Sequence, residues 1–283
     1  RIQEAMRKAG IAAIDHLITT HYHTDHFGGV PQLAAAVRIA KFYDHGPMTT
    51  LAEDADFVKK YSAYRAAAHN RTITLKPGDE IKLRRASGTP PIRLRCLASN
   101  GVTINETRPG KSANPECQSA SLKPDDPSDN ARSVAIWLRY GEFDFFDAGD
   151  LTWNIEHHLF CPSNPLGEVD LYQVTHHGLN TSNNPLVMKS LRPTVAIMNN
   201  GPRKGGHPET VRWLQDIPSL KALYQMHLNT QSAAEENTAR EFIANLAEQP
   251  DDANSIIVAI DSVSRSFTVT NGRTGTSQTY PIK

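Results

Sequence analysis

One short loop near the start of the sequence concentrates groups that bind metal ions. His21, His23, Asp25 and His26 lie within six residues, directly after an apolar, β-branched stretch that predicts a strand at 14–20. Side chains alternate along an extended chain, so His21 and His23 project to the same side, and Asp25 and His26 extend from the turn that follows. Imidazole and carboxylate groups are ligands for zinc, and also for manganese or iron. The spacing predicts that this loop presents two imidazoles to one ion, and a carboxylate with an imidazole to another.

The elements that must position this loop alternate between strands and helices. Apolar periodicity and turn residues predict helices at 2–9, from Pro31 onward, and at 53–68, 184–191, 207–216 and 235–246. Further strands are predicted at 80–85, 91–98, 133–140, 143–147, 169–175, 194–199, 222–227, 255–260, 265–271 and 277–281. The alternation predicts a layered α/β fold, and the hairpins make its sheets mixed rather than purely parallel. Because no repeat or linker interrupts the pattern, we expect one domain over 1–283.

Composition excludes several classes of protein. The 283 residues are 39% hydrophobic and carry 30 Lys+Arg against 30 Asp+Glu, so the formal net charge is zero. Such a chain is too apolar for a disordered protein, and it lacks the basic excess of a dedicated nucleic-acid binder. Its apolar runs are too short to predict a membrane span. We therefore expect a small-molecule or phosphoester substrate, and nucleic acid is not favoured.

Five segments, in order along the chain, give a more specific resemblance. Thr-His-Tyr-His-Thr-Asp-His-Phe-Gly-Gly at 20–29 resembles the metal-binding signature of the metallo-β-lactamase-fold hydrolases. Phe-Phe-Asp-Ala-Gly-Asp at 145–150 resembles the strand that ends in a metal-bridging Asp, and Val-Thr-His-His-Gly at 174–178 resembles a later ligand-bearing strand end. Segments 130–134 and 206–208 also match. The subgroup they most resemble contains the ComEC-type DNA-uptake domains and the bacterial choline-phosphate esterases.

This resemblance implies a four-layer αββα sandwich and a site for two divalent metal ions, zinc or else manganese. By position, the ligands of one ion are His21, His23 and Asp150, and the ligands of the other are Asp25, His26, Asp150 and His176. A water molecule bridging two such ions is activated as hydroxide, and the ions stabilise the oxyanion that its attack creates. The resemblance thus implies a metallohydrolase without a protein nucleophile.

Roles next to the metals are also carried over by resemblance. Asp25 can orient the attacking water, and His177 and His207 can contact the ligands or the substrate. Three of the site assignments have an alternative interpretation. Asp150 could cap a helix at 152–160, His176 and His177 could be a surface pair, and His207 could lie at a helix N-terminus. His45 and His69 lie outside the motifs, and we interpret both as ordinary surface or helix-end residues.

The sequence departs from the family pattern at two places. The family commonly has one more metal-binding His about twenty residues before the bridging Asp, but 127–133 reads Pro-Ser-Asp-Asn-Ala-Arg-Ser. The subgroup shares this gap, which leaves the first ion with fewer protein ligands. The fold normally begins with strands before the first helix, whereas this sequence starts at that helix. We expect the fold to lack its opening strands here, with residues missing upstream.

The remaining predictions concern the substrate side and the compartment. The loop at 199–207 carries Arg203 and Lys204, which could hold a phosphate or carboxylate. Residues 99–130 predict a long loop that forms a wall or lid of the cleft, and its Cys117 could pair with Cys161. A phosphodiester is the favoured substrate, with a lactone or β-lactam as the alternative. A mononuclear iron dioxygenase and a non-catalytic metal-binding module rank lower. The composition slightly favours an exported or periplasmic protein.

Overall fold

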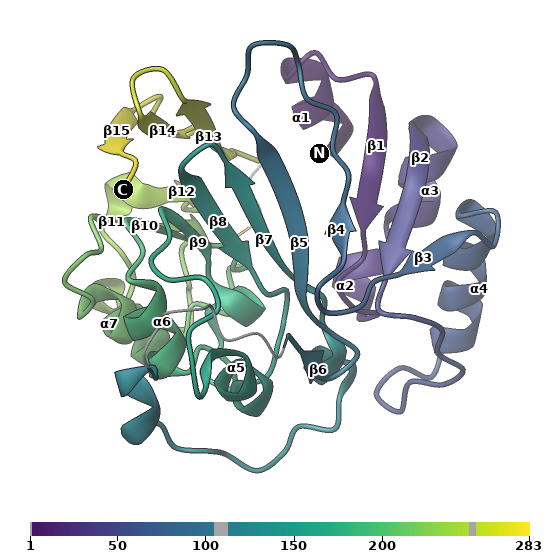
Figure 1. Cartoon of the computed structure of the whole chain (residues 1–283), viewed down its shortest axis with the longest axis horizontal. Helices are drawn as coiled ribbons and strands as arrows, with labels where there is room; N and C mark the ends of the chain where they lie inside the picture. The colour runs from purple at the N-terminus through teal and green to yellow at the C-terminus, as the bar shows by residue number, and fades with distance from the viewer. Residues whose placement is uncertain (1, 105–112, 249–252) are drawn as a thin grey trace.

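The computed structural model describes residues 2–104, 113–248 and 253–283, and it contains three sheets (Figure 1). The first is parallel and joins β1 (Ala13–Ile18), β2 (Arg38–Asp44) and β3 (Thr72–Thr74). The second has nine strands: β4 (Glu80–Ile81), β5 (Ile92–Ser99), β6 (Val102–Thr103), β7 (Ala135–Tyr140), β8 (Phe143–Asp147), β9 (Leu171–Gln173), β10 (Val195–Met198), β11 (Ala222–His227) and β12 (Ile243–Asn245). The third is antiparallel and joins β13 (Ile256–Asp261), β14 (Ser266–Asn271) and β15 (Ser277–Pro281).

The nine-stranded sheet is mixed, as the hairpin in the sequence predicted. Its order is β12-β11-β10-β9-β8-β7-β5-β4, with β6 beside β5. The strands from β8 to β12 run parallel, while β7 pairs antiparallel with both β8 and β5. Parallel strands carry their connections across a face of the sheet, and here those connections are helical. The carboxyl ends of β8, β9 and β10 therefore meet at one edge.

Helices cover one face of this sheet and one face of the N-terminal sheet. The helices in the described residues are α1 (Ile2–Lys8), α2 (Thr24–Phe27), α3 (Val30–Ala36), α4 (Phe57–Ala67), α5 (Trp153–Phe160), α6 (Pro185–Leu191) and α7 (Pro208–Gln215). Of these, α5, α6 and α7 pack on the nine-stranded sheet, and α3 and α4 pack on the N-terminal sheet. Short 3-10 turns are η1 (Pro115–Gln118), η2 (Asp129–Arg132), η3 (Thr175–Gly178), η4 (Ala234–Glu236) and η5 (Arg240–Phe242). No helix within the described ranges has the length and apolar character needed to cross a membrane.

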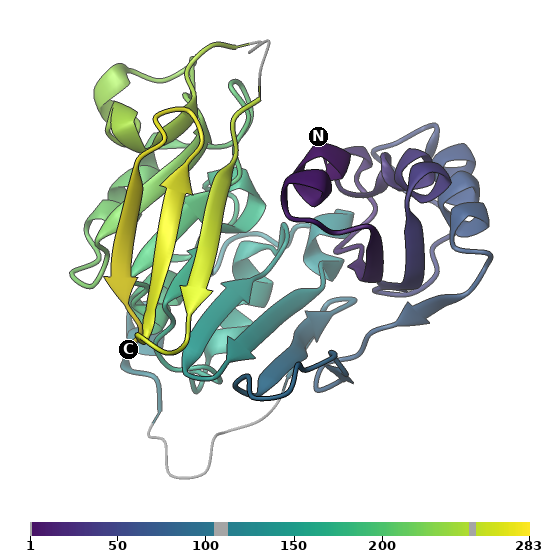
Figure 2. The same ribbon diagram turned by 90° about the horizontal axis from the view of Figure 1, so that it is seen from above.

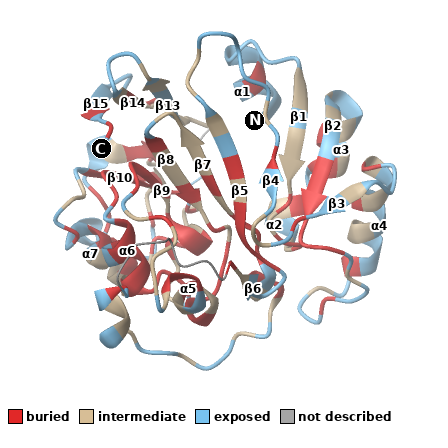
Figure 3. Ribbon diagram, in the orientation of Figure 1, coloured by how far each residue is buried: buried red, intermediate tan, exposed pale blue. Residues whose placement is uncertain are grey.

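Alternation along the central strands explains the layers. In β8, Phe146 points to the helices α5, α6 and α7, whereas Phe143 packs against Phe267 of β14. Leu94 of β5 faces the N-terminal sheet, whose other face is covered by α3 and α4. The two three-stranded sheets thus lie apart on the same face of the central sheet, near its opposite ends (Figure 2). The result is the predicted αββα sandwich, with buried residues concentrated on the central strands, α5 and α6 (Figure 3).

Three local predictions differ from the structure. β2 and β3 were not predicted, and α4 begins at Phe57 rather than at residue 53. The helix expected at 235–246 is wrong: this stretch forms η4, η5 and β12. Asn237 explains the difference, because its buried side-chain oxygen accepts from the backbone N–H of Asn229 and from Gln225 Nε2. Such side-chain bonds compete with the helical ladder.

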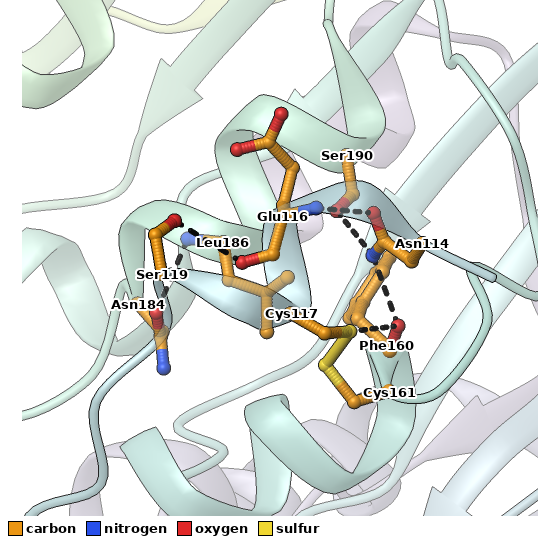
Figure 4. The surroundings of a disulfide bond; sticks show 9 residues. All are labelled: Asn114, Glu116, Cys117, Ser119, Phe160, Cys161, Asn184, Leu186 and Ser190. Carbon is orange, nitrogen blue, oxygen red and sulfur yellow. Dashed lines mark hydrogen bonds between the residues drawn. A yellow bond between two sulfur atoms is a disulfide. The ribbon is translucent and has the colours of Figure 1, made fainter.

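The predicted disulfide is present and anchors the long loop. Cys117 of η1 and Cys161 at the end of α5 are joined, with an S–S distance of 2.00 Å (Figure 4). Nearby, Asn114 Nδ2 donates to the carbonyl of Phe160 and to Ser190 Oγ. The described residues 113–130 are thereby held against α5 and α6, while 105–112 of the predicted loop lie outside the described residues.

Candidate metal centre

The His-rich loop follows β1 at the edge of the N-terminal sheet. Its first two histidines turn toward each other, with His21 Nε2 3.1 Å from His23 Nδ1. His21 is fully buried, and His23 is half-buried at the start of α2. The sequence predicted that these two imidazoles share a side, and the structure places them so.

A second group forms where α2 meets the end of β9. His26 Nε2 lies 3.2 Å from His177 Nε2, and Asp25 Oδ2 lies 3.3 Å from His177 Nε2. Asp25, His26 and His177 thus offer three ligand atoms close enough to hold one cation. His21, His26 and Asp150 form another such group. The two groups share His26, so they belong to one continuous cluster.

Asp150 lies at the centre of this cluster. Its side chain is 3% exposed, and four imidazole Nε2 atoms lie 3.2 to 3.8 Å from Oδ2: those of His21, His26, His176 and His177. Within the described part of the chain, this buried oxygen has no hydrogen bond of acceptable geometry. A buried carboxylate oxygen is normally satisfied by donors or by a metal ion. A shared carboxylate among imidazole nitrogens fits divalent cations, so the residues present suit the metals that the sequence predicted.

Close backbone contact brings the loops together. Gly149 has φ +55°, and a Cβ added there would lie 2.8 Å from Thr20 Cβ. The loop carrying Asp150 therefore packs directly on the residue before His21. The backbone N–H of His176 donates to the carbonyl of Gly149 over 2.9 Å, which joins the third loop to the same point.

Each imidazole that turns Nε2 into the cluster has a polar partner at its other nitrogen, Nδ1. Thr20 Oγ1 lies 3.2 Å from His21 Nδ1 and 3.3 Å from His26 Nδ1. The partner of His176 Nδ1 is Ser182 Oγ, at 2.9 Å, and His177 Nδ1 donates to the carbonyl of Asn199 over 2.8 Å. Outer hydrogen bonds of this kind fix the orientation of a ligating imidazole. Four of the histidines thus direct Nε2 into the cluster.

The charges of the cluster shift the pKa values of its members. Burial raises the pKa of the Asp150 carboxyl, but the His177 and His26 imidazoles beside it outweigh burial, so the net shift is strongly downward. The hydrogen bond from His177 is also the main cause that lowers the pKa of Asp25. Burial alone lowers the pKa of His177, yet Asp150 and Asp25 raise it to about 9. Burial lowers the pKa of His176 to about 4, which keeps that imidazole neutral at pH 7.

The structure separates the two histidines of 176–177 in a way the sequence did not. Both Nε2 atoms lie near Asp150 Oδ2, that of His177 at 3.4 Å and that of His176 at 3.6 Å, but His177 also lies beside Asp25 and His26. Both have left-handed backbone conformations, with φ of 51° and 55°. The assignment of His176 as ligand and His177 as its neighbour stays a prediction.

His207 lies at the edge of the site. Its backbone N–H donates to the carbonyl of Gly178, and its Nδ1 accepts from the N–H of Glu209 as the N-cap of α7. The structure therefore shows the helix-capping role, and a catalytic role for His207 stays a prediction. Lys204 reaches the site, where its ammonium pairs with Asp25, but Arg203 pairs with Glu248 instead.

Three residues beside the His-rich loop were not predicted from the sequence. His45 was expected at the surface, and this is wrong: it is 1% exposed, and its Nε2 lies 3.2 Å from Asp129 Oδ2. Burial against the Tyr22 ring and this carboxylate explain the difference. Glu53 accepts from His23 Nε2 over 3.1 Å. No spacing rule connects these residues to the loop, because they come from separate turns. His69 is exposed just after α4, as predicted.

Comparison with known families agrees with this fold and site. Residues 2–94 match the family model described as the metallo-beta-lactamase superfamily. That segment carries the whole His-rich loop, and the remaining strands complete the layered fold around it. This N-terminal third of the chain is therefore similar to the metallo-beta-lactamase superfamily. No curated protein matches it.

Solved structures show distant likenesses. A presumed metal-dependent hydrolase of Parabacteroides distasonis is 16% identical, with 76% of this chain and 77% of that chain covered and a TM-score of 0.41. Igni18, a metallo hydrolase of Ignicoccus hospitalis, is 14% identical, with 75% and 76% covered and a TM-score of 0.42. CmlA, a diiron β-hydroxylase of Streptomyces venezuelae, is 13% identical, with 75% and 39% covered and a TM-score of 0.38. These scores are too low to carry an assignment.

Proposed function

We propose that this protein is a metal-dependent hydrolase that acts on phosphoesters. The observation that carries the proposal is Asp150 Oδ2, a buried carboxylate oxygen surrounded by four imidazole nitrogens and without a hydrogen bond from the described residues. Outside a metal site, this arrangement would leave a buried acceptor unsatisfied at considerable cost. The match of residues 2–94 to the metallo-beta-lactamase superfamily supports the same conclusion, since that fold commonly serves hydrolysis.

The residues divide into two ligand sets that share Asp150. The first set is His21, His23 and Asp150. The second is Asp25, His26 and Asp150, together with His176, as the sequence predicts, or with His177, whose Nε2 lies beside Asp25 and His26. Two divalent ions held this way would lower the pKa of a bound water and stabilise the negative charge that develops on the substrate. Zinc is the expected ion because both sets combine imidazole with carboxylate ligands, and manganese is the alternative.

The protein's own groups supply orientation and charge. Thr20 holds the rings of His21 and His26 from behind, so that both keep Nε2 toward Asp150. Lys204 lies on the outer side of Asp25, where its ammonium can bind an anionic oxygen of a substrate.

A cavity beside the cluster presents two ammonium groups, which suit an anionic substrate. It has a volume of about 580 Å³, and its lining includes Asp25, His177, Lys204, Asn199 and Lys8 of α1. A lactone or β-lactam would not need ammonium groups next to the site. The motif resemblance to ComEC-type domains and choline-phosphate esterases points the same way, so we favour a phosphodiester.

Hydrolysis of bis(p-nitrophenyl) phosphate by the zinc- or manganese-loaded protein tests the proposal. Turnover that disappears in Asp150→Ala, together with loss of bound metal, is the expected result. Lys204→Ala should raise KM for the phosphodiester, because it removes the ammonium beside the site. Arg203→Ala is the matched control: it removes a cation from the same loop, but one that pairs with Glu248, and KM should not change.

Two results would refute parts of the proposal. A protein that binds two ions per chain but does not cleave phosphodiesters or phosphomonoesters would refute the substrate class, and nitrocefin and acyl lactones would then be assayed. A protein that binds neither zinc nor manganese would refute the metal-dependent mechanism itself.

We also propose that the protein acts in an oxidising compartment, as an exported or periplasmic protein. The Cys117–Cys161 disulfide supports this, because such bonds persist mainly outside the cytosol. Counting free thiols in protein isolated under acid quench tests it: one free thiol, that of Cys96, is expected.

A further inference from the structure

His23 is oriented differently from the other histidines of the cluster. Its Nδ1 faces His21 Nε2, and its Nε2 points outward to Glu53 Oε1 at 3.1 Å. The others turn Nε2 inward and are held at Nδ1; these are His21, His26, His176 and His177. The metal-facing atom of His23 is therefore Nδ1, and the outer bond that fixes its ring comes from Glu53.

The chemistry of Glu53 decides where the proton of His23 lies. An ionised carboxylate only accepts hydrogen bonds, so the bond requires a hydrogen on His23 Nε2. A neutral imidazole carries one ring hydrogen, and Nδ1 is then left with a free lone pair. That lone pair points toward His21 Nε2, so the two nitrogens could bind the same metal ion. Glu53 thus prepares His23 as a ligand through Nδ1.

A second loop fixes Glu53 in place. The backbone N–H of Asp129 donates to the same Oε1 over 3.2 Å, and the carboxylate of Asp129 accepts from the backbone N–H of Tyr22 over 2.6 Å. Asp129 is 1% exposed. Tyr22 is held at its other end too, because its hydroxyl donates to the carbonyl of Gly46. Two carboxylates from separate turns therefore hold the His21–His23 segment: that of Asp129 at the backbone of the segment, and that of Glu53 at the His23 ring.

Partial exposure does not remove this role. The Glu53 side chain is 38% exposed, so water competes for it, and an isolated surface contact of this kind would contribute little. Here the buried Asp129 N–H shares the acceptor, which keeps Oε1 on the His23 side. The outer bond is needed for orientation more than for stability.

We propose that Glu53 is a positioning residue that fixes the Nε2–H tautomer of His23 and so completes the first metal site, which lacks a third histidine. This inference rests on the proposed metal centre. It adds a residue from the turn before α4 to that centre and links it, through Asp129, to the segment that the disulfide anchors.

Zinc transfer to a chromogenic chelator tests the proposal independently of hydrolysis. Removing an outer partner of a ligating histidine typically weakens metal binding by about 10- to 100-fold. Glu53→Ala should therefore weaken the binding of one of two zinc ions by that factor. Glu53→Gln keeps an acceptor oxygen and should lose much less. Asp56→Ala, which removes an exposed carboxylate from the same turn, is the control and should bind zinc like the wild type.

Ring-nitrogen NMR of the zinc-loaded full chain supplies a second measurement. His23 should carry its proton on Nε2 in the wild type and in Glu53→Gln, and Glu53→Ala should shift the ring nitrogens. Circular dichroism confirms that each variant is folded. Unchanged zinc transfer in Glu53→Ala, equal losses in Glu53→Ala and Glu53→Gln, or a wild-type proton on Nδ1 would each overturn the proposal. A wild type that binds no zinc would instead refute the proposed function.

Discussion

Removal of the Cys117–Cys161 disulfide should lower the free energy of unfolding by about 4 kcal/mol. The bond joins residues 44 apart in sequence, and the chain-entropy relation for a closed loop of this length gives about 13 cal/mol/K, or about 4 kcal/mol at 25 °C. The loop encloses β7, β8 and Asp150. The cross-link therefore limits the unfolded chain over the segment that supplies the centre of the site.

Chemical denaturation of the double variant Cys117→Ser/Cys161→Ser measures this effect. The variant should unfold at lower denaturant concentration than the oxidised wild type. Adding reductant should bring the wild type down to the variant and leave the variant unchanged. Alkylation of the unreduced, denatured wild type should add one label, on the buried Cys96, whose thiol has its pKa raised to about 12 by burial in the folded state.

Two results would refute this reasoning. A difference below about 1 kcal/mol between the oxidised wild type and the variant would show that loop closure contributes little. Labelling of all three cysteines without reductant would show that the bond does not form. Hydrogen bonds of Asn114 to Phe160 and Ser190 would then be the main attachment of η1, as Figure 4 shows.

Three further predictions concern pH and packing. Burial raises the pKa of Glu156 to about 7 from 4.5, so the protonated carboxyl favours the folded state. As the pH rises from 4.5 to above 7, the wild type should therefore lose about 3 kcal/mol of unfolding free energy relative to Glu156→Gln. Chemical denaturation of both proteins at each pH measures this difference. Zinc must displace the proton of His177, whose pKa lies at about 9, so zinc affinity should rise with pH up to that value in chelator titrations; a flat profile would contradict this. Gly149→Ala places a Cβ 2.8 Å from Thr20 Cβ, and thermal unfolding should show a loss of about 1–3 kcal/mol together with weaker zinc binding.

The metal-binding loop could be predicted from sequence because its signals are local. Alternation along an extended chain places His21 and His23 on one side whatever the rest of the fold does. The layered fold was predictable for a related reason. Strands alternate with helices over most of the chain, and the turn of the β7–β8 hairpin is a local signal that the sequence shows directly. The disulfide was expected but not fixed, because pairing depends on where the two cysteines end up in space.

Tertiary structure alone decided which residues surround that loop. Glu53, Asp129 and His45 come from turns that no spacing rule relates to His23, and only the contacts formed between these turns in the folded protein bring them beside the loop. The helix predicted at 235–246 failed for the same reason, because bonds from distant side chains outweighed local propensity there. Sequence patterns thus determine groups that lie close along the chain, whereas the outer contacts that orient a metal ligand depend on long-range contacts formed only in the folded protein.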